Sequence, residues 1–215
     1  MKRLELALYP GSIADAPVET LAVPIPEDER PLRGNAGFVD WRLGGEISRQ
    51  LKSGFVSGAS GEAVLLPAQR PFAAARILLF GLGPAESTGR VLQRAFSVGA
   101  GKLIGLRTPL ALLALPGSVD FELDGEFLLR GCVQALSAAR GDQRLSLVLP
   151  DAEKHDATLD AVLAEVSQDA HRRQVALDVT WIEVEPQEPS RTAEPAKQAA
   201  KDDPGRAAAV AHSQV

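Results

Sequence analysis

The sequence predicts an α/β fold with a mixed, largely parallel sheet flanked by helices. After residue 60, apolar runs of strand length alternate with segments whose apolar positions follow the helical period. Several of these runs are apolar without alternation, which is typical of strands buried on both faces. With 45% hydrophobic and 24% charged residues, the chain is expected to form one globular domain with a sizeable core.

The first sixty residues predict two strands and one helix. The strands are expected at residues 4–9 and 20–25, and two strands ahead of the first helix suggest an antiparallel edge. Between residues 38 and 51 apolar residues recur every four positions, which lines up one helix face. Gly44 and Gly45 interrupt this segment and weaken a helix by about 1 kcal/mol each relative to alanine, so tertiary packing must hold it.

The remaining elements follow in alternation. Runs at residues 63–66 and 76–80 predict strands buried on both faces. Ser87 or Thr88 offers an N-cap for a helix whose expected inner face is Val91, Leu92, Ala95, Phe96 and Leu103. Further strands are predicted at residues 110–115, 145–149 and 176–185, and further helices at 126–139 and 158–170.

The composition changes after residue 185. Residues 186–215 contain no Leu, Ile, Met or aromatic residue, but four prolines, four acidic and four basic residues. Such a segment buries too little apolar surface to offset the entropy of ordering it. We therefore expect a domain over residues 1–185 and a disordered tail over residues 186–215.

Charge and cysteine content narrow the functional classes. The formal charge of -5 and the isoelectric point near 5.3 make nucleic acid an unlikely partner class. The chain shows no membrane-spanning segment and no export signal, and it has one cysteine, so we expect a cytoplasmic protein without a membrane partner. No spaced His/Cys cluster predicts a structural metal, and no cofactor is expected.

Three segments, in order, resemble the N-terminal domain of the leucyl aminopeptidase family, the cytosol aminopeptidases. An Asp precedes a helix with a Leu-x-Gly pattern, a Gly-Phe and a Gly-Glu pair lead to a strand, and a basic residue opens a strand that ends in Gly-Leu-Gly. These places are held by Asp40, Leu43, Gly45, Gly54, Phe55, Gly61, Glu62, Arg76, Gly81, Leu82 and Gly83. The segment from Phe127 to Gly131 resembles the family's next glycine-containing helix, so the resemblance covers about residues 15–140.

The resemblance implies a macro-domain-like, three-layer fold without peptidase activity. In the family the metal ligands and the catalytic arginine lie in a separate C-terminal domain, and its motifs do not occur in this sequence. We therefore expect a non-catalytic domain that binds a protein partner. Two alternatives stay open: a subunit acting in trans with a catalytic aminopeptidase chain, and a macro-like module for a nucleotide or an ADP-ribose derivative. The oligomeric state is not predicted.

A small ligand could bind outside the carboxyl ends of the strands, as is usual in open α/β sheets. The residues expected there are Pro67, Gly81, Gly83, Thr88 and Gly117. The Gly-Leu-Gly-Pro turn is not a dinucleotide fingerprint, and Glu86 would repel a pyrophosphate. A tight strand-to-helix turn is the favoured interpretation of these glycines.

Other chemically distinctive residues have structural interpretations. The group Asp151, Glu153, His155 and Asp156 could suggest a metal site, but acidic residues at a helix start are favoured by the helix dipole. His171 is expected at the end of the same helix for the complementary reason. Cys132 is expected in the core, residues 27–29 in a surface loop, and Ser60 and Ser97 have no nucleophile context.

Overall fold

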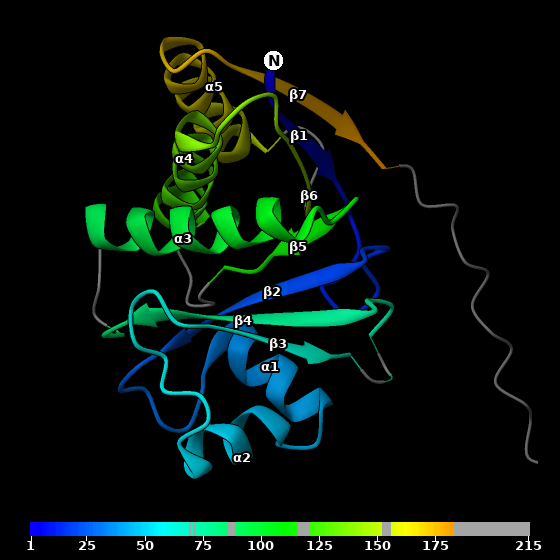
Figure 1. Cartoon of the computed structure of the whole chain (residues 1–215). Coiled ribbons are helices and arrows are strands. Elements are labelled where there is room, and N and C mark those ends of the chain that lie inside the picture. Colours follow the sequence, from blue (N-terminus) through cyan, green and yellow to red (C-terminus); the bar gives the residue numbers. More distant parts are fainter. Residues whose placement is uncertain (69, 71, 86–88, 116–120, 152–155, 183–215) are drawn as a thin grey trace, which may run out of the picture. The chain divides into compact units, whose positions relative to one another are not determined.

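The computed structural model describes residues 1–68, 70, 72–85, 89–115, 121–151 and 156–182 of the chain (Figure 1). One compact unit spans Met1–Val184. The expected tail, residues 186–215, lies outside the described residues. No helix in the described ranges has both the length and the apolar content needed to cross a bilayer.

Seven strands and five helices are formed by the described residues. The strands are β1 (Lys2–Leu8), β2 (Thr20–Pro26), β3 (Ala63–Pro67), β4 (Arg76–Gly83), β5 (Ala111–Leu113), β6 (Arg144–Leu149) and β7 (Val175–Trp181). The helices are α1 (Gly34–Arg42), α2 (Glu46–Ser53), α3 (Arg90–Leu106), α4 (Phe121–Ala138) and α5 (Ala157–Arg172). The strand and helix order predicted after residue 60 is confirmed.

The strands form one mixed sheet in the order β3-β4-β2-β5-β6-β1-β7 (Figure 1). Every neighbouring pair is parallel except β3 and β4, which are antiparallel. An antiparallel edge was expected from the first two strands, and this was wrong in its location: β1 and β2 both run parallel to their neighbours, while β3 supplies the edge. The short connection between β3 and β4 explains this, because a parallel pair needs a longer crossover.

Two helical layers cover the sheet and make the fold three-layered. Side chains on one face of the strands pack with the inner faces of α3, α4 and α5. Those on the other face, such as Leu21, Val23 and Leu79, pack with α1 and α2 through Ala36, Val39 and Ile47. β2 is buried along its whole length because both layers cover it.

The segment predicted as one helix over residues 38–51 forms two. Gly44 and Gly45 both have positive φ, 64° and 80°, so the chain leaves the helical conformation between α1 and α2. Asp40 ties the two helices together, because its Oδ1 accepts a hydrogen bond from the backbone N–H of Ser48 at 3.0 Å. The expectation that tertiary packing holds one helix through the glycine pair was therefore wrong.

Three further expectations were wrong in detail. β3 is not buried on both faces, since it is the edge strand and Leu65 is 45% exposed. Val91 does not belong to the inner face of α3, being 54% exposed. Gly89 is the N-cap of α3, and neither Ser87 nor Thr88 lies among the described residues. Leu92, Ala95, Phe96 and Leu103 are buried as predicted.

A glycine sets the close crossing of α3 and α4. A Cβ on Gly131 would lie 2.8 Å from the carbonyl oxygen of Gln93 and 2.9 Å from the backbone nitrogen of Ser97. No side chain fits there, so the backbones of the two helices approach closely. One turn along α4, the carboxamide of Gln134 accepts a hydrogen bond from the Gln93 carboxamide at 3.1 Å.

The buried ring of Phe80 provides a test of this packing. It is 1% exposed, lies 6.2 Å from the Phe96 ring between centroids, and packs against Gly99 of α3. We expect Phe80→Ala to lower the free energy of unfolding by about 3–5 kcal/mol through lost burial and a residual cavity. Val91→Ala, on an exposed face of the same layer, should change it by less than about 0.5 kcal/mol. Urea unfolding midpoints measure both, and equal effects would contradict the layer assignment.

Candidate functional site: the carboxyl end of strands β2 and β4

The loop of residues 57–62 lies across the carboxyl end of β4. The backbone N–H of Gly83 donates to the Gly58 carbonyl at 3.0 Å, and that of Gly81 donates to the Glu62 carbonyl at 2.9 Å. On the other side of the strand, the backbone N–H of Glu27 donates to the Gly83 carbonyl at 2.8 Å. The end of β4 is therefore bonded to two segments that are far apart in the sequence.

The Glu62 carboxylate organises this loop from within. It accepts hydrogen bonds from the backbone N–H of Gly58 at 2.7 Å and of Ser57 at 2.9 Å, and from the Ser57 hydroxyl at 3.0 Å. Partial burial raises the pKa of Glu62, but these donors outweigh burial and hold that pKa below its usual range. Glu62 is thus an ionised structural anchor whose oxygens are already occupied.

Glycine is required at this strand end for two different reasons. A Cβ on Gly81 would lie 1.8 Å from the Ala59 carbonyl oxygen, so the loop could not approach a larger residue. Gly83 has space for a Cβ, but its φ of +83° is a conformation that other residues rarely adopt. Gly58 combines both, with φ +84° and the Pro26 carbonyl oxygen 2.5 Å from a Cβ position.

Residues 26–30 complete the closure from the β2 side. The Arg30 guanidinium donates to the carbonyls of Pro26 at 2.9 Å and Ser57 at 3.2 Å, which joins this segment to the loop. Asp28 Oδ1 accepts from the backbone N–H of Ala85 at 2.7 Å. The acidic segment predicted as a surface loop therefore has a structural part, since Asp28 holds the turn after β4.

The residues expected to line a ligand pocket are only partly together. Gly81 and Gly83 lie at the carboxyl end of β4, as the sequence predicts. Pro67 does not lie with them: β3 is antiparallel, so Pro67 pairs with Arg76 at the opposite end of β4. The expectation for Pro67 was wrong because it treated β3 as a parallel strand. Thr88 and Gly117 lie outside the described residues.

The other chemically distinctive residues take structural places where they are described. Cys132 is fully buried, and burial raises the pKa of its thiol to about 12. Asp156 is the N-cap of α5, since its Oδ1 accepts from the backbone N–H of Thr158 at 2.9 Å, and His171 lies in the last turn. Partial burial raises the pKa of Asp151. Glu153 and His155 lie outside the described residues, and no group of three or more potential metal ligands occurs among those described.

An exposed aromatic surface on α1, formed by Trp41 with Phe38 and Arg42, was missed by the sequence analysis, as was the separate exposed ring of Phe55. Trp41 is 71% exposed and Phe55 is 60% exposed, although both residue types usually bury much of their surface. The Trp41 and Phe38 rings lie 6.3 Å apart between centroids, and the Arg42 guanidinium carbon lies within 6.0 Å of both. The signal was present: in a helix with Val39 facing inward, Trp41 falls two positions away and faces solvent.

Comparisons with known proteins agree with this fold. A family model described as the N-terminal domain of the cytosol aminopeptidase family matches residues 21–136, more than half of the chain. A probable cytosol aminopeptidase of Pseudomonas syringae pv. tomato is 35% identical over 113 residues. The match covers 52% of this chain and 23% of that protein, so the chain corresponds to about a quarter of its relative.

Solved structures with similar folds have low sequence identity. A tomato leucine aminopeptidase gives a TM-score of 0.57 at 15% identity, covering 80% of this chain and 36% of the other. The macro domain of ganglioside induced differentiation associated protein 2 gives 0.53 at 12% identity, covering 75% and 84%. An Oceanobacillus iheyensis macrodomain with ADP gives 0.50 at 12% identity, covering 74% and 89%. These likenesses confirm the macro-domain-like fold.

The close approach at Gly81 predicts a specific sensitivity. Gly81→Ala should lower the free energy of unfolding by about 1–3 kcal/mol, because the new methyl group displaces the loop from β4. Gly101→Ala is the matched control: its Cβ would meet nothing within 4 Å on α3, and alanine should raise stability by up to about 1 kcal/mol. Urea denaturation followed by circular dichroism measures both changes. Loss of the same size in both variants would show that the loop does not press on Gly81.

Proposed function

We propose that this chain, which belongs to the cytosol aminopeptidase family through its N-terminal domain, is a non-catalytic domain that binds a protein partner through the aromatic surface of α1. The matched family model describes the N-terminal domain alone. The proposal therefore does not assign the peptidase activity of the full-length relatives to this chain.

The exposure of Trp41 carries the proposal. An indole left 71% exposed keeps a large apolar surface in water, and burying it against a partner would release that surface. Tryptophan and arginine are also the residues most enriched among those that dominate binding energy at protein interfaces. Trp41 and Arg42 are adjacent at the end of α1, so one partner could contact both.

Arg42 indicates the chemistry of that partner. Its guanidinium lies over Phe38 and Trp41, and its buried Nε has no hydrogen-bond partner among the described residues. The aromatic rings hold this side chain without an ion pair from the described part of the chain. A partner that offers an apolar pocket for the indole and a carboxylate beside it would complement this surface.

The two alternatives predict different partners. If the chain acts in trans with a catalytic aminopeptidase chain, that chain is the protein bound through Trp41, and hydrolysis of leucine p-nitroanilide appears only when both are mixed. If the chain is a nucleotide module, ADP-ribose raises the melting temperature. The fold likeness to a macrodomain with ADP motivates this arm of the test, although it shows the fold alone.

We expect Trp41→Ala to weaken partner binding at least tenfold, because truncating a central aromatic anchor costs about 2 kcal/mol or more. Leu65→Ala is the matched control, since Leu65 is also an exposed apolar residue but belongs to the edge strand β3. Both variants should unfold at the wild-type urea concentration. The partner is captured from a native lysate, identified, purified and titrated against the three proteins. Equal affinity for wild type and Trp41→Ala would contradict the proposal.

A further inference from the structure

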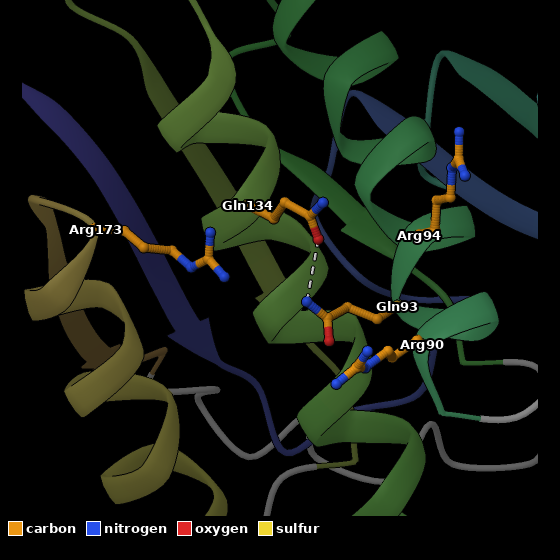
Figure 2. Close-up of a pocket in the computed structure, with 5 residues that line it drawn as sticks. All are labelled: Arg90, Gln93, Arg94, Gln134 and Arg173. Atoms are coloured by element: carbon orange, nitrogen blue, oxygen red, sulfur yellow. Dashed lines mark hydrogen bonds between the residues drawn. The ribbon is translucent and has the colours of Figure 1, made fainter.

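The helical layer opposite α1 and α2 contains a polar hollow of about 620 Å³, lined by Arg90, Gln93, Arg94, Gln134 and Arg173 (Figure 2). Three of these residues come from the first turns of α3, one from α4 and one from the end of α5. The tight crossing at Gly131 brings α3 and α4 together where Gln93 donates to Gln134, and both residues line the hollow.

Two of the three arginines, Arg90 and Arg173, flank the carboxamide pair in the hollow. In Figure 2, Arg173 reaches from α5 toward Gln134, Arg90 lies below Gln93, and the Arg94 guanidinium points away from the carboxamide pair. Arg173 Nε donates to Asp169 Oδ2 at 3.0 Å, and Asp169 is 8% exposed. This buried carboxylate fixes the guanidinium of Arg173. Its other two nitrogens make no hydrogen bond with the described residues.

The Arg90 side chain, unlike that of Arg173, is not held by a carboxylate of the described residues, so its donors can bind a ligand. It is exposed, and among the described residues it forms neither an ion pair nor a hydrogen bond through its side chain. Among the described lining residues three are arginines and none is acidic, so the lining carries a net positive charge in a protein of formal charge -5, although Asp169 outside the lining pairs with Arg173. An arrangement of this kind attracts anions locally against the overall charge.

We propose that this hollow binds a small molecule that carries two adjacent phosphoryl groups, held between Arg90 and Arg173. A guanidinium donates two parallel hydrogen bonds to phosphate oxygens, and two guanidinium groups on opposite walls suit two phosphoryl groups better than one. The Gln93 and Gln134 carboxamides also line the hollow, and their amide hydrogens that are not used in the bond between them can donate to bridging or terminal oxygens. The volume lies within the usual range of small-molecule sites.

An acidic protein segment fits this hollow less well. Arginine clusters can also recognise acidic segments, but each carboxylate offers two acceptor oxygens and one charge, whereas a phosphoryl group offers three acceptor oxygens and more charge. The proposal is independent of the aromatic surface, which lies on the layer against the other face of the sheet. Trp41→Ala should therefore leave phosphate binding unchanged.

Isothermal titration of the full chain with pyrophosphate at low ionic strength tests the proposal. We expect binding that weakens as sodium chloride is added. Arg90→Gln and Arg173→Gln should each raise the Kd at least tenfold. The matched control is Arg33→Gln, which removes the same charge from the exposed N-cap of α1 and should leave the Kd within twofold.

Further titrants identify the ligand class. ADP binding as tightly as pyrophosphate, or more tightly, would assign the phosphoryl groups to a nucleotide, and weaker ADP binding to a free oligophosphate. Under either result, Arg90→Gln should weaken binding of the ligand at least tenfold. Arg90→Gln removes no hydrogen bond or ion pair among the described residues, so its result stands even if Arg173→Gln unfolds through loss of the Asp169 pair. No pyrophosphate binding, wild-type binding by Arg90→Gln, or tighter binding of hexaglutamate than of pyrophosphate would overturn the proposal.

Discussion

The close contact between loop 57–62 and the glycines of β4 is the constraint on which this end of the molecule depends. The loop connects α2, on one face of the sheet, to β3 at its edge. Because Gly81 has no side chain, the loop carbonyls reach the strand, and β3 can begin its antiparallel pairing at Ala63 opposite Phe80. The same contact seats Val56, 2% exposed, in the core beneath α1 and α2. One missing Cβ thus links the edge strand, the smaller helical layer and the end of β4.

Because loop 57–62 covers the carboxyl end of β4, we expect binding at the helical layers rather than at the strand ends. In many open α/β sheets the carboxyl ends of the strands hold the ligand. Here the described polar groups at the end of β2 and β4 are used internally: Glu62 with Ser57 and Gly58, Asp28 with Ala85, and Arg30 with the carbonyls of two segments. On the helical layers, by contrast, Trp41 keeps a large exposed surface and Arg90 keeps side-chain donors that no described residue uses. A macro-domain-like fold therefore does not by itself place the function of this chain at its strand ends.

The sequence predicts the central strands well because a strand buried on both faces is a continuous run of apolar residues. β2 and β4 are mostly continuous apolar runs, and β2 ends one residue and β4 three residues beyond the expected bounds. β3 carries a similar run but is an edge strand, since a short apolar segment does not reveal whether a neighbour covers it. The sequence also shows the pair Gly44 and Gly45, but it does not show whether packing keeps these residues helical or lets them adopt positive φ and divide the helix.

The sites were harder to predict because they combine distant residues. The hollow requires Gln93, Gln134 and Arg173, which meet only through the crossing at Gly131 and the end of α5. No spacing along the chain connects them. The exposed Trp41 needed only the orientation of α1, which the inward-facing Val39 already gives. Family membership, by contrast, could be predicted from short motifs in a fixed order. Two glycines of those motifs are required for different reasons: Gly81 because a Cβ would collide with the loop, and Gly83 because its φ is positive.

Amide hydrogen exchange at individual residues, followed by nuclear magnetic resonance, tests the central claim most directly. If loop 57–62 is a fixed part of the sheet end, the amides of Gly58, Gly81 and Gly83 should exchange as slowly as those of Leu79 and Phe80 inside β4. The Gly81 and Gly83 amides donate to loop carbonyls across the closure, and the Gly58 amide donates to the Glu62 carboxylate within the loop. Exchange of the three glycine amides at the rate of an unprotected peptide, with Leu79 and Phe80 still protected, would show that the loop opens freely and would contradict the account.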